Sequence, residues 1–186
     1  MFLVVTRNFP PDIGGIQSLM GGLSKSLVNH GPVKVFAYEF PNSKLYDKNS
    51  TINIERVKGV KIFRKFRKSR LVNSFIANNQ NIRAILTDHW KSLELLNTEN
   101  TKKYKTFCLI HSKEINHELG SSLNKRLLKS IDKTDLVIAN SNFTKKLATD
   151  LGVDPKKIKI IFPGIDVPKP VEEKFKTEAK KIYNES

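Results

Sequence analysis

The chain has 186 residues, 39% of them hydrophobic, which is enough to bury one substantial core and predicts a single globular domain. Its 33 Lys and Arg outnumber 18 Asp and Glu, and the resulting net charge of +15 favours anionic partners without choosing among them. No apolar run reaches the roughly 18 residues that a membrane-spanning helix needs, and the single Cys108 excludes an internal disulfide. With no leader-like segment at Met1, we expect a cytoplasmic protein.

The first elements predicted are a strand, a loop and a helix. The apolar run FLVVT, residues 2–6, is typical of a buried strand, and the turn-rich segment RNFPPDIGG follows it. Apolar residues then recur at spacings of three and four, which predicts one buried helix face made by Ile16, Leu19, Met20, Leu23 and Leu27. This helix is expected to end near Gly31, before a second strand at VKVFAY, residues 33–38.

Short apolar runs alternate with helical patterns along the rest of the chain. Strands are predicted at VKIF, IRAILT, TFCLI, LVIAN and IKIIF, which are residues 60–63, 82–87, 106–110, 136–140 and 158–162. Helices are predicted between these strands, at residues 71–79, 91–99, 121–131 and 143–151. Because parallel neighbours need crossover connections, the alternation predicts an α/β fold, a Rossmann-like, doubly wound parallel sheet with helices on both faces.

The composition changes after Phe162, where prolines and charges replace apolar periodicity. We therefore assign residues 1–168 to the Rossmann-like domain. Residues 169–186 are interpreted as a linker or the start of another domain.

Ligands of open parallel sheets bind beyond the carboxyl ends of the strands, so the loops there hold the candidate site residues. Gly14 and Gly15 stand at the start of the first helix, where glycine lets a ligand approach the backbone and free N–H groups can bind an anion such as a diphosphate. An ordinary glycine turn explains the same residues. Neither the G-x-G-x-x-G dinucleotide fingerprint nor a P-loop is present.

Two later strand ends also carry polar residues. His111 follows the strand at 106–110, where an imidazole can hydrogen-bond a sugar hydroxyl or a phosphate, although a lone histidine is often structural. His117 lies six residues later without spaced cysteines or carboxylates, so we predict no metal site. Ser141 suits the N-cap of the helix after the strand at 136–140.

Four segments together resemble one family. FPPDIGG after the first strand, a histidine after a mid-domain strand, ANSNFT, and a closing PGID are similar to the N-terminal domain of the retaining enzymes of glycosyltransferase family 4. That group includes phosphatidylinositol mannosyltransferases and many lipopolysaccharide and exopolysaccharide transferases. The resemblance covers about residues 1–168 and implies the N-terminal, acceptor-side half of a GT-B fold.

The resemblance implies a reaction and a set of roles. A sugar would pass from a UDP- or GDP-sugar to a hydroxyl of a lipid-linked acceptor or growing polysaccharide, with retention and with neither metal nor cofactor. Gly14 and Gly15 match the pair whose amides meet the donor diphosphate, and His111 matches the active-site histidine. Where the family often shows H-G-H-E, this chain has His111-Ser112-Lys113-Glu114, so only the first and last positions match. The sugar and acceptor pocket is expected to include Asp12, Asp88, His89, Glu114 and Ser141.

Family members also carry a second Rossmann domain with a basic pair and an E-x7-E pattern for the donor. Twenty residues follow Asp166, too few for that domain. We therefore expect the chain to need a C-terminal domain, from the same gene or from a split partner. Alone it is expected to be inactive and to bind donor weakly.

Between Arg56 and Arg70 the sequence RVKGVKIFRKFRKSR has eight basic residues, two phenylalanines and no acid. We interpret it as a patch for anionic membrane surfaces, such as the inner membrane face, formed by Lys61, Phe63, Arg64, Lys65, Phe66, Arg67, Lys68 and Arg70. A solvated edge strand explains the same charges. So does a non-catalytic nucleic-acid-binding module, although no nucleic-acid motif accompanies them and no specific nucleic acid is expected. An oxidoreductase or methyltransferase would need a glycine fingerprint that is absent.

Overall fold

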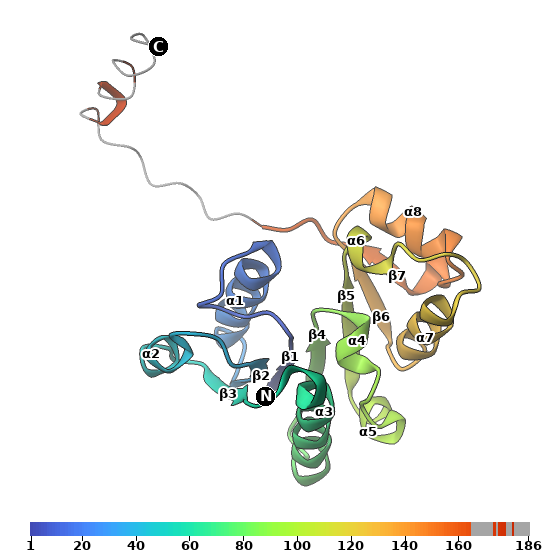
Figure 1. Cartoon of the computed structure of the whole chain (residues 1–186), viewed down its shortest axis with the longest axis horizontal. Helices are drawn as coiled ribbons and strands as arrows, with labels where there is room; N and C mark the ends of the chain where they lie inside the picture. The colour runs from blue at the N-terminus through green and yellow to red at the C-terminus, as the bar shows by residue number, and fades with distance from the viewer. Residues whose placement is uncertain (165–172, 174, 178–179, 181–186) are drawn as a thin grey trace.

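Seven strands form one parallel sheet in the order β3-β2-β1-β4-β5-β6-β7 in the computed structural model, which describes residues 1–164, 173, 175–177 and 180 (Figure 1). The strands are β1 Phe2–Val5, β2 Val33–Tyr38, β3 Asn53–Val57, β4 Ala84–Thr87, β5 Lys105–Ile110, β6 Leu136–Ala139 and β7 Ile158–Ile160. The helices are α1 Gly15–Val28, α2 Ser43–Lys48, α3 Lys61–Asn78, α4 Trp90–Leu93, α5 Thr98–Lys102, α6 Ser112–Ile115, α7 Ser122–Ile131 and α8 Asn142–Asp150, with a 3-10 turn at Pro155–Lys157. The predicted Rossmann-like α/β class is confirmed.

The strand order reverses between β1 and β4, since the chain builds outward from β1 to β3 and then returns to start again at β4. At the carboxyl edge of the sheet, the loops that follow β1 and β4 run in opposite directions and leave a crevice between them. Open α/β sheets bind ligands in this crevice. The loop between β1 and α1 and the loop that follows β4 flank this position. The fold therefore brings the expected site loops to one edge.

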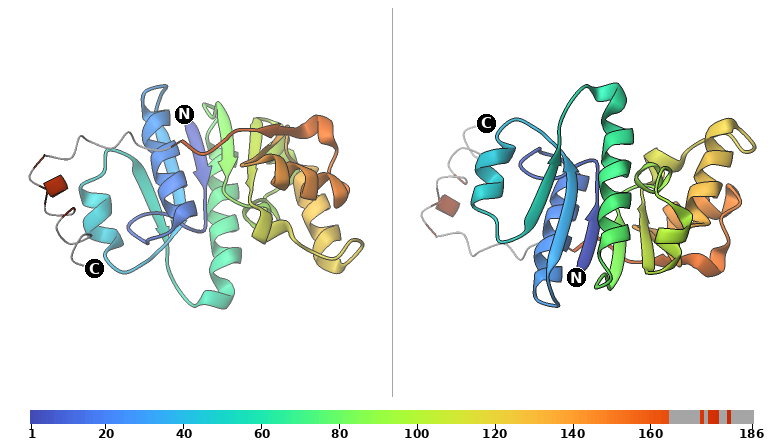
Figure 2. Two further views of the ribbon diagram at one scale, coloured as in Figure 1. Left: turned by 90° about the horizontal axis from the view of Figure 1, so that it is seen from above. Right: turned by 90° about the horizontal axis from the view of Figure 1, so that it is seen from below.

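Helices cover both faces of the sheet, and α1 lies on the opposite face from α3 (Figure 1, Figure 2). On the α1 side, Met20 packs with Val4, Val35 and Phe9 in one apolar cluster. On the other side a larger cluster joins α3, α4, α7 and α8 to the sheet and includes the fully buried Trp90 and Cys108. Burial raises the pKa of the Cys108 thiol to about 12, so this cysteine is a core residue and not a nucleophile.

The expected strand at VKIF, residues 60–63, is wrong. The edge strand is the more polar segment Asn53–Val57, and VKIF instead lies at the start of the long helix α3, which begins at Lys61. Among the described strands β3 pairs on one edge only, with β2, and an edge strand needs fewer apolar residues than a central one. Two short helices, α2 and α6, were not predicted because neither spans two full turns.

The loop between β1 and α1 is held in place by contacts from two sides. Pro10 lies so close to α1 that a Cβ added at Gly21 would be 2.7 Å from the Pro10 ring, and this close approach requires glycine. The Arg56 side chain pairs with Asp47 at 2.8 Å, donates to the Pro10 carbonyl and lies over the Phe9 ring. Arg56 begins the basic segment in the sequence, yet in the fold it fixes the loop that leads to the diglycine.

Within the described residues, no helix is long and apolar enough to cross a membrane. The domain boundary expected at residue 168 lies outside the described part of the chain, as does most of the linker expected over 169–186.

Candidate functional site

A cavity of about 990 Å³ lies beside α1, on the face of the sheet that α1 covers only in part. Its floor is apolar and consists of Leu86, Leu109 and Ile138, from β4, β5 and β6. One wall is α1, and the segment 161–164 after β7 closes the opposite side. Gly15 and His111 both line it, so the structure brings these two predicted residues to one cavity. Its size and apolar floor are typical of small-molecule sites.

The start of α1 offers unpaired backbone donors to this cavity. Gly14 is the N-cap residue and makes no side-chain cap, and the first turn holds no acidic residue. The first N–H groups of a helix have no intrahelical acceptor, and the helix dipole adds partial positive charge there. A Cβ added at Gly15 would meet nothing within 4 Å, so this position is open to a ligand. The helix start can therefore bind an anionic group.

His111 stands at the carboxyl end of β5, where the strand gives way to α6. Its Nδ1 lies 3.5 Å from the Nδ2 atom of Asn140, and Asn140 also lines the cavity. Burial lowers the pKa of His111, and the Asp88 carboxylate opposes this only in part, so the ring is neutral near pH 7. His111 is thus a neutral hydrogen-bonding group beside the cavity.

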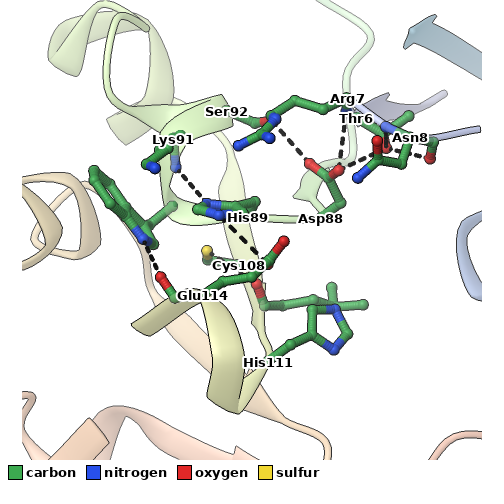
Figure 3. Close-up of polar contacts among 12 residues, drawn as sticks. Thr6, Arg7, Asn8, Asp88, His89, Lys91, Ser92, Cys108, His111 and Glu114 are labelled. Atoms are coloured by element: carbon green, nitrogen blue, oxygen red, sulfur yellow. Dashed lines mark hydrogen bonds and ion pairs between the residues drawn. The ribbon is translucent and has the colours of Figure 1, made fainter. Parts of the chain in front are cut away.

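Asp88 lies behind the cavity and ties the ends of β1 and β4 together (Figure 3). Its Oδ2 accepts hydrogen bonds from the Thr6 hydroxyl and the Arg7 backbone N–H, each at 2.9 Å, and its Oδ1 accepts from the Ser92 hydroxyl at 2.8 Å. Asp88 is 1% exposed. With these three hydrogen bonds Asp88 organises the loops, and it does not line this cavity; its expected role in the acceptor pocket stays a prediction.

Lys68 is also internal, which corrects its assignment to the surface patch. Its side chain passes from α3 into the core, where Nζ donates to the Thr6 carbonyl at 2.9 Å and to the Ser92 hydroxyl at 3.3 Å. Only 3% of Lys68 is exposed, and burial lowers its pKa to about 8 while Asp88 opposes the shift. The sequence carried a signal for this, because Lys68, Val72 and Ile76 share one helical stripe and all three are buried.

His89 and Glu114 form a second buried pair, and Figure 3 shows the His111 ring directed away from it. The Nδ1 atom of His89 accepts the Lys91 backbone N–H at 2.9 Å, so Nε2 carries the proton and faces the Glu114 Oε2 atom at 3.4 Å. Burial lowers the pKa of His89 to about 3 and raises that of Glu114 to about 7. Neither side chain lines this cavity, and their expected place in the acceptor pocket stays a prediction.

The last two expected pocket residues make local contacts. Asp12 accepts a hydrogen bond from Gln17 in the first turn of α1. Ser141 caps α8 by accepting the Thr144 backbone N–H at 3.1 Å, as its sequence position suggested. In the described part of the chain, no group of three or more His, Cys, Asp or Glu side chains is arranged to hold a metal ion.

Comparisons with known proteins agree with this architecture. The family model of Glycosyltransferase Family 4 matches residues 13–169. Among solved structures, Anabaena HepE in complex with UDP superposes with a TM-score of 0.73 at 15% identity, over 97% of this chain and 49% of that one. A glycosyltransferase from Rickettsia africae gives 0.67 at 19% identity, over 97% of this chain and 49% of that one.

Sucrose-phosphate synthase from Thermosynechococcus elongatus, at 14% identity, gives a TM-score of 0.62 and is covered over 98% of its chain by 100% of this one. The chain spans about half the length of HepE and of the Rickettsia protein. No curated protein sequence matches it. With a family match over most of its length and a sheet shared with these structures, the chain belongs to glycosyltransferase family 4 and forms a Rossmann-like half of a GT-B fold.

Proposed function

We propose that this chain is the acceptor-side domain of an enzyme that transfers a sugar from a UDP- or GDP-sugar to an acceptor hydroxyl, with retention and without a bound metal. The observation that supports this most is the single cavity lined by both the start of α1 and His111. HepE, which shares the fold, was crystallised with UDP and with UDP-glucose.

The start of α1 is the proposed site of the donor diphosphate. Transfer of the sugar leaves a nucleoside diphosphate whose negative charge grows as the glycosidic bond breaks, so groups that meet this charge lower the barrier. Backbone N–H groups at Gly15 and the next positions supply such donors without a side chain of their own. Glycine at position 15 leaves room for the phosphate oxygens to approach them.

His111 is proposed to orient the transferred sugar. It lines the same cavity, and its neutral ring contributes hydrogen bonding without adding a charge beside the sugar. Among the described residues that line this cavity, Lys25 is the one Lys or Arg, so they do not supply the basic pair expected for the leaving diphosphate. We therefore propose that those cations come from a second domain, carried by the same gene or by a partner chain, and that this chain alone transfers no sugar.

We expect His111→Ala to lower kcat about 100-fold or more in the enzyme assembled with its second domain, because an oriented hydrogen bond in the reaction centre is lost. Sugar transfer from UDP- and GDP-sugars measures this. His117→Ala is the matched control, since His117 does not line the cavity. Near-normal turnover of His111→Ala, with the fold intact by circular dichroism, contradicts the role.

We also propose that the first turns of α3 contact an anionic membrane, where a lipid-linked acceptor would reside. Ile62, Phe63 and Phe66 are 72%, 62% and 52% exposed, and the exposed Lys61, Lys65, Arg67 and Arg70 surround them. Exposed aromatics flanked by cations suit an interface with acidic headgroups better than plain solvent does. Lys68 is not part of this surface.

Vesicle sedimentation tests the membrane contact. The chain is expected to bind phosphatidylglycerol vesicles but not phosphatidylcholine vesicles, and Phe63→Ser with Phe66→Ser is expected to weaken binding several-fold. Phe143→Ser removes an equally exposed ring from α8, outside the basic run, and serves as the control. Equal loss in the control, or salt-sensitive binding to duplex DNA with none to vesicles, would reject the proposal in favour of a nucleic-acid surface.

A further inference from the structure

Three side chains at the start of α8 form a short hydrogen-bonded chain that ends on His111. The Ser141 hydroxyl donates to the Thr144 Oγ1 atom at 3.0 Å, and the Thr144 hydroxyl donates to the Asn140 Oδ1 atom at 2.7 Å. The other end of the same amide, Nδ2, faces His111 Nδ1 at 3.5 Å. Thr144 is buried, so water does not compete for its hydroxyl.

The short distance between Thr144 and Asn140 indicates which end of the amide points which way. A separation of 2.7 Å is typical of an O–H···O bond, whereas N–H···O bonds are usually about 2.9–3.0 Å. The Asn140 oxygen therefore faces Thr144, and its N–H groups face His111. An N–H that points at Nδ1 requires a lone pair there, so in the neutral ring the proton is on Nε2.

We propose that Asn140 is a positioning residue that holds His111 in the Nε2–H tautomer, so that this ring meets its ligand as a hydrogen-bond donor. The inference rests on the proposed function only for the identity of that ligand, an oxygen of the sugar or phosphate. His111 Nε2 is buried and has no partner among the described residues. A buried N–H without an acceptor is a group that a bound oxygen would satisfy.

The surroundings of His111 leave this tautomer choice to Asn140. Among charged groups, Asp88 at the end of β4 acts on the ring through space, without a hydrogen bond to it. Glu114 and His89 are engaged with each other, and neither bonds to His111. Because burial lowers the pKa of His111, the neutral ring is the relevant form near pH 7.

Nitrogen-15 NMR of the histidine rings in this chain tests the proposal directly. The His111 signals are assigned with a His111→Gln variant, and the expected spectrum is that of an Nε2–H ring. Asn140→Asp keeps the shape and the Thr144 hydrogen bond but places a carboxylate beside Nδ1. It is expected to move the proton to Nδ1 and to raise the pKa of His111 by about 1–3 units.

Asn142→Asp is the matched control, since it makes the same chemical change at an exposed position of α8. Thr144→Val frees the amide to rotate and is expected to give mixed tautomers, while Thr144→Ser restores one. An Nδ1–H ring in the unmodified chain, or identical titrations of Asn140→Asp and Asn142→Asp, overturns the proposal. Expected spectra together with full turnover of His111→Ala would instead leave Asn140 as a positioning residue and remove the proposed catalytic role.

Discussion

Burial, more than charge pairing, sets the protonation of the side chains behind the cavity. Near pH 7 His89 is neutral, and Glu114 is partly protonated because burial raises its pKa to about 7. The pair is therefore a polar contact with little net charge and not a strong ion pair, despite the 3.4 Å separation of Nε2 and Oε2. His89 and Glu114 therefore add little charge near His111, and Asp88 is the charged group that acts on its ring.

Stability is expected to depend on pH through Glu114. Its carboxyl binds a proton more tightly in the folded chain than in the unfolded one, so its contribution to folding is complete below pH 4.5 and is lost as the pH rises to about 7. Glu114→Gln does not titrate. As the pH rises through this window, we expect the free energy of unfolding of Glu114→Gln to increase by about 2–3 kcal/mol relative to that of the unmodified chain.

Urea unfolding at a series of pH values measures this difference. His89 acts with the opposite sign, because its lowered pKa gives stability that is lost as the pH falls from 6.5 towards 3, and it is present in both proteins. Glu118→Gln, at an exposed position on the loop after α6, is the control and is expected to show no such gain. A pH-independent difference for Glu114→Gln would contradict the assignment.

Sequence reasoning reached some of these side chains and not others, for a physical reason. Gly15 and His111 were predicted because each follows a strand, and all parallel strands end at one edge of the sheet. Asp88 and His89 follow a strand too, but sequence cannot show that Thr6, Arg7 and Ser92 would donate hydrogen bonds to the Asp88 carboxylate. The position marks the right region, and the local hydrogen bonds decide whether a residue faces the cavity.

Helix α3 joins a surface and a core function on opposite sides. Phe63, Phe66 and Lys65 face outward, while Lys68 enters the core and reaches the Thr6 carbonyl. In sequence the basic run is continuous, which is why Lys61, Lys65 and Lys68 were assigned to one patch. The helical period puts Phe63 and Phe66 on the side away from the buried stripe of Lys68, Val72 and Ile76. Lys65 shares the direction of that stripe but lies nearer the start of the helix, where it is exposed.

Two substitutions in α3 separate these roles. Lys68→Met is expected to lower the free energy of unfolding by about 1–3 kcal/mol, because the buried Thr6 carbonyl and Ser92 hydroxyl lose a donor. Lys65→Met is expected to change stability by less than about 0.5 kcal/mol, since Lys65 is exposed. Chemical unfolding measures both. Equal effects of the two changes would contradict the buried position of Lys68.

Elements with a strong period were predicted well, and elements defined by their neighbours were not. Buried central strands such as β4 and β5 are continuous apolar runs that only a two-sided sheet explains. The edge strand β3 has polar residues that resemble a loop, while VKIF resembles a strand but continues into a helix of 18 residues. Pairing with β2 selected the first segment, and that contact lies beyond the reach of local patterns.

The chain as a unit presents an open site at one edge of a parallel sheet. The cavity has a floor and one firm wall, and it is lined on the far side by residues 161–164. HepE shares this fold over 49% of its own chain and was crystallised with UDP. Among the described residues that line the cavity of this chain, Lys25 is the one Lys or Arg. We propose that a second lobe completes the donor site and supplies the further cations that a diphosphate needs.

Titration of this chain with UDP-glucose and GDP-mannose, followed by amide and histidine-ring NMR, tests the shared cavity most directly. Binding is expected to be weak, in the millimolar range, and to shift the amides of Gly14, Gly15 and Ile16 together with the His111 ring. Gly15→Ala, which adds a methyl group where the phosphate would lie, should weaken these shifts. Ser74→Ala, at an exposed position of α3 on the opposite face of the sheet, is the control and should not weaken them. Shifts at the start of α1 without any at His111, or shifts confined to α3, would contradict a common site for the diphosphate and the sugar.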